Sequence, residues 1–141
     1  MTPFQCLLCN QYAEITKNGR DGRKAQLNTL MLLTVMFTLW VVIMMLLYDY
    51  IHPGFLRENV IVEGLSGKAI GRLLGCIVGV IIFICLKLTI GTKNWYNKTI
   101  EEYNSLPEEE QTRISKKGIR FFIIGFIPIM IGIVLAFTTV F

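Results

Sequence analysis

The sequence predicts an all-α integral membrane protein with three transmembrane helices and a short cytoplasmic helical hairpin between helices 2 and 3. Of the 141 residues, 53% are hydrophobic and only 17% are charged, and the mean hydropathy is +0.55. A typical soluble domain has about a quarter of its residues charged. The apolar residues also gather into three long blocks, whereas a soluble helix or strand would space them periodically. Long apolar blocks are typical of membrane spans.

The first block predicts a transmembrane helix over residues 27–48. No charged residue lies between Lys24 and Asp49. At about 1.5 Å per residue, such a run crosses a hydrocarbon core of about 30 Å. The preceding residues, 1–26, have no signal-peptide pattern. We therefore expect them to form a cytoplasmic amino-terminal segment and expect the first block to remain in the mature protein.

The second block predicts a transmembrane helix over residues 69–91. Arg72 lies near its start and Lys87 near its end, which leaves 14 uncharged residues between them. Both long side chains can extend towards the membrane surface, so the full span reaches about 20 residues. We expect these two cations either to contact lipid headgroups or to line a pore.

The third block predicts a transmembrane helix over residues 119–141, and its last 21 residues carry no charged side chain. Pro128 lies near the middle. A proline inside a membrane helix removes one backbone hydrogen bond and usually produces a kink, so we expect this helix to continue through it.

Residues 92–118 predict a cytoplasmic helical connection. Aromatic and apolar residues recur there at roughly helical spacing, namely Trp95, Tyr96, Ile100 and Tyr103. This spacing predicts that the second helix continues past the membrane as an amphipathic stalk. Ser105 followed by Glu108 matches a capping box, which predicts a separate short helix from Leu106 to about Lys117. We favour a solvated hairpin; the alternative is that carboxylates gather a divalent cation, and the candidates are Glu101, Glu102, Glu108, Glu109 and Glu110.

The cations that flank the three blocks predict the orientation. Most of them lie before the first block or between the second and the third: Lys17, Arg20, Arg23, Lys24, Lys93, Lys98, Arg113, Lys116 and Lys117. The segment 49–68 carries only Arg57 and Lys68. By the positive-inside rule, the amino terminus and the connection 92–118 are cytoplasmic. The segment 49–68 is then an external loop, the carboxyl terminus is external, and the protein is a multi-pass protein of the cell (inner) membrane.

Small residues form two stripes in the predicted spans. Gly67, Gly71, Gly75 and Gly79 recur every four residues and therefore share one helix face. A second stripe consists of Gly125, Gly132 and Ala136. Membrane helices associate largely through close backbone contact at such small residues. We expect the two stripes to pack against each other; the alternative is that one stripe closes the monomer and the other builds an oligomer.

Cys6 and Cys9 form a C-x-x-C pair near the amino terminus. This spacing is half of a zinc site, but no second pair and no neighbouring histidine completes it. We therefore expect reduced cytoplasmic thiols and no bound metal, with these two cysteines as the weak metal candidates.

Residues 103–136 resemble a family of small, functionally uncharacterised bacterial membrane proteins. The resemblance rests on the segment just before the last membrane helix, Tyr103-Asn104-Ser105-Leu106-Pro107-Glu108-Glu109-Glu110, which fits the family's Tyr-Asn-x-x-x-x-Glu-Glu pattern. The family has two membrane helices, so the first block and the C-x-x-C pair fall outside it. The resemblance implies a bacterial membrane location and no particular activity.

The predicted function follows from what the spans contain. No Asp, Glu or His lies deep inside them, whereas coupled transporters need such groups. We expect a non-enzymatic protein without cofactor that acts through helix packing, as a homo-oligomer or an accessory subunit of a membrane complex. Its expected partners are the lipid bilayer and other membrane helices, not nucleic acid. The alternatives are a channel or transporter component formed by several copies, and a membrane immunity or stress protein.

Overall fold

The computed structural model describes residues 1–53 and 67–140. Within these ranges the chain forms five helices: α1 (Pro3–Lys17), α2 (Lys24–Ile51), α4 (Gly67–Thr89), α5 (Lys93–Asn104) and α6 (Glu108–Val140). The all-α prediction is confirmed. Most of the expected external loop, at residues 54–66, lies outside the described residues.

Three of the helices are long and apolar enough to cross a membrane. The candidate spans are Lys24–Ile51, Gly71–Thr89 and Glu108–Leu135. The prediction of three such helices is confirmed. Little of their apolar surface is covered within the chain: 17% of the apolar window of the first span is buried, none of the second and 11% of the third. Their outer surfaces therefore need an apolar environment.

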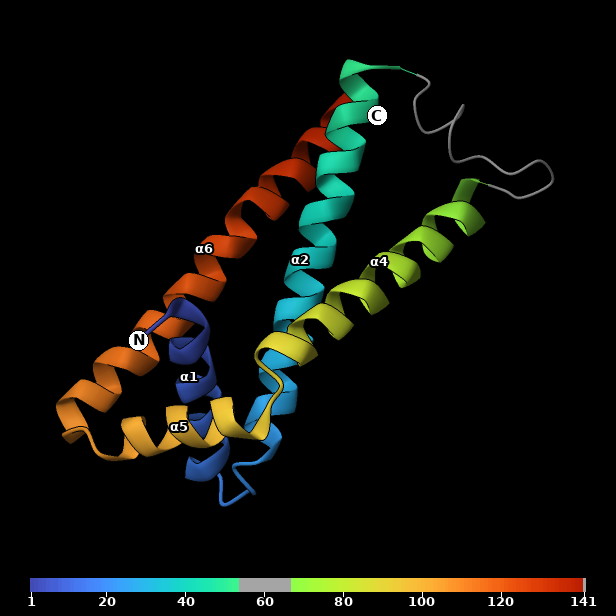
Figure 1. The fold of residues 1–141 in the computed structure, drawn as a ribbon. Helices are drawn as coiled ribbons and strands as arrows, with labels where there is room; N and C mark the ends of the chain where they lie inside the picture. Colours follow the sequence, from blue (N-terminus) through green and yellow to red (C-terminus); the bar gives the residue numbers. More distant parts are fainter. Residues whose placement is uncertain (54–66, 141) are drawn as a thin grey trace.

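One end of the molecule holds all the short helices. Figure 1 shows α1 and α5 beside the starts of α2 and α6, and we call this end the base. From the base, α2 and α6 rise together, whereas α4 leans away from α2 towards its own amino-terminal end. The base thus brings α1 and α5 together with the first turns of α2 and α6 and the end of α4.

The amino-terminal segment is a helix, although the sequence analysis assigned it no structure. Thr2 and Gln5 form a capping box, and Pro3 occupies the first turn. In that box the Gln5 N–H donates to Thr2 Oγ1 and the Thr2 N–H donates to Gln5 Oε1. Each side chain thus satisfies a backbone donor that a helix start leaves unpaired.

The first half of α1 is the centre of the base. Five consecutive residues, Cys6 to Asn10, are buried. Consecutive residues of a helix point in all directions, so α1 must be enclosed on every side. Three clusters enclose it: Leu7 packs with Leu33 and Met36 of α2 and Ile129 of α6, Leu8 with Ala25 of α2 and Ile100 of α5, and Cys6 and Cys9 with Tyr103 of α5 and Ile114 of α6.

The predicted stalk and the predicted separate short helix are both wrong. α4 ends at Thr89 and α5 begins at Lys93, where Thr92 Oγ1 accepts a hydrogen bond from the N–H of Trp95. The chain therefore turns at residues 90–92 instead of continuing straight. α6 then runs without a break from Glu108 through Pro128, so residues 108–117 belong to the third long helix.

Ser105 does not cap α6, because it closes α5. Its N–H donates to the carbonyl of Glu101 over 3.0 Å, and its Oγ donates to the carbonyl of Glu102 over 2.7 Å. A Ser-x-x-Glu pattern fits a helix start, but the hydroxyl is equally able to bond to the last carbonyls of the preceding helix.

Amide side chains fix the turns of the base. Gln26 Nε2 donates to the carbonyls of Ile90 and Thr92, over 3.3 and 3.1 Å, and so ties α2 to the α4–α5 turn. Gln111 Nε2 donates to the carbonyls of Tyr103 and Leu106 at the end of α5. These carbonyls lie at or beside helix ends, and those of Thr92 and Tyr103 also accept backbone N–H groups, from Tyr96 and Leu106.

Candidate functional site

The glycines of α6 are covered by other helices of the same chain. Gly118 lies so close to the main chain of Cys6 in α1 that a Cβ there would overlap its carbonyl oxygen. A Cβ at Gly125 would lie 2.5 Å from Met36 Sδ, and one at Gly132 would lie 3.1 Å from Ile43 Cγ2, both in α2. The three glycines are spaced by seven residues, about two helical turns, so they share one face. This face is where α6 packs on α1 and α2.

The glycines of α4 are less covered by other helices than those of α6. A Cβ at Gly79 would lie 3.6 Å from Thr38 Oγ1 of α2, but Cβ atoms at Gly71 and Gly75 would meet no atom of the described residues within 4 Å. The reason is the divergence of α4 from α2 (Figure 1), which separates the two helices beyond Gly79. The side-chain surroundings of Gly67 and of Ala136 lie outside what the structure describes.

The expected packing of the two stripes against each other is therefore not what the described residues show. Gly125 and Gly132 face α2, and α4 also packs against α2, at Gly79. The geometry agrees with the alternative in which one stripe closes the monomer. The other stripe, at Gly71 and Gly75, is left open.

The rest of α4 presents apolar side chains outwards. The strongly exposed ones are Leu73, Ile77, Val80, Ile81, Ile84 and Leu88. The two cations of this helix, Arg72 and Lys87, are also exposed and lie near its opposite ends. Their positions suit the surface regions of a bilayer, where a long cationic side chain reaches water or headgroups.

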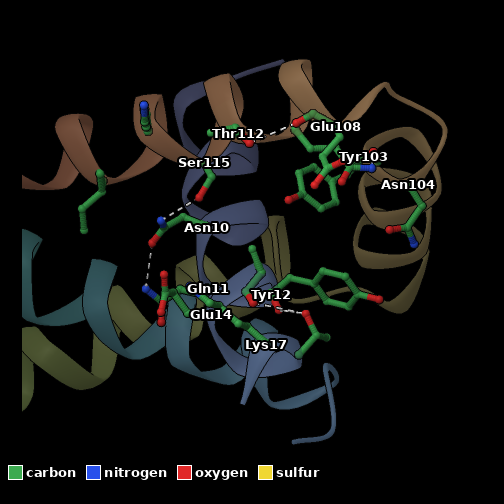
Figure 2. Close-up of a pocket in the computed structure, with 15 residues that line it drawn as sticks. Asn10, Gln11, Tyr12, Glu14, Lys17, Tyr103, Asn104, Glu108, Thr112 and Ser115 are labelled. Atoms are coloured by element: carbon green, nitrogen blue, oxygen red, sulfur yellow. Dashed lines mark hydrogen bonds between the residues drawn. The ribbon is translucent and has the colours of Figure 1, made fainter. Parts of the chain in front are cut away.

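A groove of about 1050 Å³ lies in the base between α1, the first turns of α6 and the end of α5 (Figure 2). At its wall, Asn10 Nδ2 donates to Ser115 Oγ over 2.9 Å, and Gln11 Nε2 donates to Asn10 Oδ1 over 3.4 Å. The lining includes two carboxylates, Glu14 and Glu108, and two cations, Lys17 and Lys116. This balance of charge indicates no single class of ligand.

Cys6 and Cys9 lie inside the base, where burial favours the neutral thiol over the thiolate. Both are buried, and Cys9 has no exposed surface. Burial raises the pKa of Cys9 to about 12, with smaller contributions from Cys6 and Glu102, and burial also raises the pKa of Cys6. Metal ligation and nucleophilic attack both need the thiolate, and this environment disfavours it.

The carboxylates of the connection do not gather. Glu101, Glu102 and Glu108 to Glu110 are exposed. Within the described residues, no group of three or more His, Cys, Asp or Glu side chains is placed to hold a metal ion. Glu110 instead lies 3.5 Å from Arg113 on the surface of α6, which is a weak, solvent-exposed pair.

One contact between the spans was not anticipated from the sequence. Trp40 Nε1 of α2 donates a hydrogen bond of 2.9 Å to the carbonyl of Gly125 in α6. The available signal was the tryptophan itself, because an indole N–H inside an apolar block needs an acceptor. The helix α1 also had a signal, the Thr2-Pro3-x-Gln5 capping pattern.

Comparisons with protein-family models, with curated proteins and with solved structures give no match for this chain. The resemblance of residues 103–136 stays a prediction. The function must therefore be argued from the helices themselves.

Proposed function

We propose that this chain is a non-enzymatic multi-pass protein of the cell membrane that works by helix packing, and that it assembles with further copies of itself through α4. In this proposal α2, α4 and α6 cross the bilayer and the base lies in the cytoplasm. The cations gathered in the base support this orientation, because positively charged residues concentrate on the cytoplasmic side of membrane proteins.

The observation that carries the proposal is the contrast between the glycines of α6 and those of α4. Gly118, Gly125 and Gly132 are each covered by α1 or α2, whereas a Cβ at Gly71 or Gly75 would have no described residue within 4 Å. Glycine in the middle of a helix costs about 0.5–1 kcal/mol relative to alanine. A close helix contact offsets this cost. The open pair on α4 is therefore the best surface for a helix from another copy.

The size of the assembly in detergent and in nanodiscs tests the proposal. Native mass spectrometry of the wild-type protein should show an oligomer. Replacing Gly71 and Gly75 together by leucine fills the open face, and we expect the dissociation constant to rise at least tenfold, about 1.4 kcal/mol. Cys76 is exposed beside Gly75, so oxidative cross-linking in membranes gives a second measurement.

A matched control adds bulk to the other side of α4. Val80→Phe with Ile84→Phe places two large side chains at exposed positions, on the face roughly opposite Gly75 at about 100° per residue. These variants should assemble like the wild type. A wild-type protein that is monomeric in nanodiscs, or a Gly71→Leu/Gly75→Leu variant that keeps the wild-type size, would contradict assembly through α4.

A further inference from the structure

The outer face of α6 carries two adjoining depressions of opposite character. The first has a volume of about 370 Å³ and is lined by four cations and one carboxylate together with a threonine: Arg113, Lys116, Lys117, Arg120, Glu109 and Thr112. The second has a volume of about 340 Å³ and an entirely apolar lining: Phe122, Ile123, Phe126, Ile127, Met130 and Ile131. A cationic surface is thus followed along one helix by an apolar one.

Most of this face points away from the rest of the chain, whereas Phe122 and Phe126 at its edge are half-buried and pack against the core. Arg120 and Ile127 each lie two residues after a packed glycine, Gly118 and Gly125 respectively, and two residues correspond to about 200° around a helix. The apolar side chains are accordingly exposed: Ile123 by 55%, Ile127 by 50% and Ile131 by 55%. The proposed assembly surface is on α4, so it leaves this face of α6 free.

The four cations outnumber the single carboxylate of the first depression. Arg113 has one weak partner, Glu110 at 3.5 Å, and their side chains are 70% and 48% exposed. An exposed pair of this kind contributes little, so Arg113 can turn to an incoming anion. Arginine and lysine are the side chains that bind phosphate oxygens.

We infer that the outer face of α6 binds an anionic phospholipid of the surrounding leaflet. The phosphate lies against Arg113, Lys116, Lys117 and Arg120, and an acyl chain lies along Ile123, Ile127 and Ile131. A lipid is favoured over a free phosphate because the apolar depression begins within two residues of the last cation, which matches a headgroup joined to a chain. The inference rests on the proposed membrane placement, but not on assembly through α4.

Native mass spectrometry of the full chain in detergent, titrated with single lipids, tests the inference. The probes are phosphatidylglycerol, phosphatidylcholine with the same acyl chains, and inorganic phosphate. We expect phosphatidylglycerol to bind more tightly than phosphatidylcholine, and salt to weaken its binding. The Lys116→Gln/Arg120→Gln variant should bind phosphatidylglycerol about 30-fold more weakly. Each cation near a membrane surface contributes roughly a factor of five to the affinity, and this variant lacks two.

The matched control is Lys93→Gln/Lys98→Gln, which removes the same charge from exposed positions of α5 in the base. This variant should lose less than about threefold, since Lys93 and Lys98 line neither depression. Far-UV circular dichroism checks that each variant folds. The native mass spectra also report the oligomeric state, so failed assembly and failed lipid binding are separate outcomes.

Three results would overturn the inference. Equal losses in the two double variants would mean diffuse attraction to the whole base. Equal affinity for the two lipids would mean that the cations do not select charge. Competition by inorganic phosphate at concentrations similar to those of phosphatidylglycerol would mean an anion site that makes no use of the apolar depression.

Discussion

The indole Nε1 of Trp40 donates a 2.9 Å hydrogen bond to the main-chain carbonyl of Gly125. The two residues belong to α2 and α6, and the same glycine receives the side chain of Met36. The absence of a Cβ at Gly125 thus allows the close contact with Met36, next to the carbonyl that Trp40 binds. This pair joins the two candidate spans that pack together above the base.

Replacing Trp40 by phenylalanine keeps most of the ring but removes the N–H. We expect the protein to be destabilised by about 1 kcal/mol, the usual range for one interhelical hydrogen bond in a membrane protein. The loss should appear as a lower midpoint of unfolding in mixed detergent micelles. Trp95→Phe is the control, because Trp95 lies on α5 in the base. Equal effects of the two substitutions would argue against a specific role of the Trp40 bond.

Gly118 and Gly71 should respond in opposite ways to alanine. A Cβ at position 118 would overlap the main chain of Cys6, which cannot move aside as a flexible side chain can. Gly118→Ala should therefore cost at least about 1–3 kcal/mol. At Gly71 no atom of residues 1–53 or of the described side chains of 67–140 lies within 4 Å of the added Cβ, and alanine favours the helix by about 0.5–1 kcal/mol.

Thermal unfolding of the monomeric form of both glycine variants, in detergent diluted until the proposed assembly dissociates, provides the measurement. Gly118→Ala should lower the melting temperature, and Gly71→Ala should leave it unchanged or raise it. A Gly118→Ala protein with wild-type stability would mean that α1 does not pack on α6 as described.

The buried Cys9 thiol should make the fold sensitive to alkaline pH. Its pKa is raised from 9.0 to about 12 by burial, so the folded state keeps a proton that the unfolded state releases. The stabilisation is complete below about pH 9 and is lost as the pH rises to about 12, at no more than about 1.4 kcal/mol per pH unit. The free energy of unfolding should fall over this window.

Burial also raises the pKa of Tyr96 and Tyr103, so these tyrosines add to the loss of stability at alkaline pH. The variant Cys9→Ala separates the contribution of Cys9 from theirs. Between pH 8 and pH 11, the free energy of unfolding should fall less steeply with pH in this variant than in the wild type. The exposed Cys76 serves as the control position. In Cys76→Ala the free energy of unfolding should fall with pH as steeply as in the wild type. Identical slopes for Cys9→Ala and the wild type would contradict the burial of Cys9.

Much of the fold could be predicted because the three long helices result from local composition. An uncharged run such as residues 25–48 forms a helix in lipid, where every backbone group must bond within its own segment. The helix boundaries in the base were harder to predict from the sequence. Ser105 fits both a helix start and a helix end, and only its bond to the Glu102 carbonyl assigns it to the end of α5.

The candidate site could be predicted only in part. The spacing of Gly71 and Gly75 placed them on one face, but spacing does not say whether another helix covers that face. Whether α2 covers these glycines depends on the angle between α2 and α4. That angle keeps Gly79 near Thr38 and leaves Gly71 and Gly75 uncovered by α2.

By itself, the sequence determined that the chain is helical, that three of its helices are apolar enough to cross a membrane, and that small residues line two of them. These properties depend on neighbours in the chain. Only the tertiary structure decided that α1 fills the base and that α6 closes on α1 and α2. It also decided that α4 keeps an open glycine face. Such pairings depend on side-chain shape between distant segments, as at Gly118 and Cys6, and no local pattern encodes that fit.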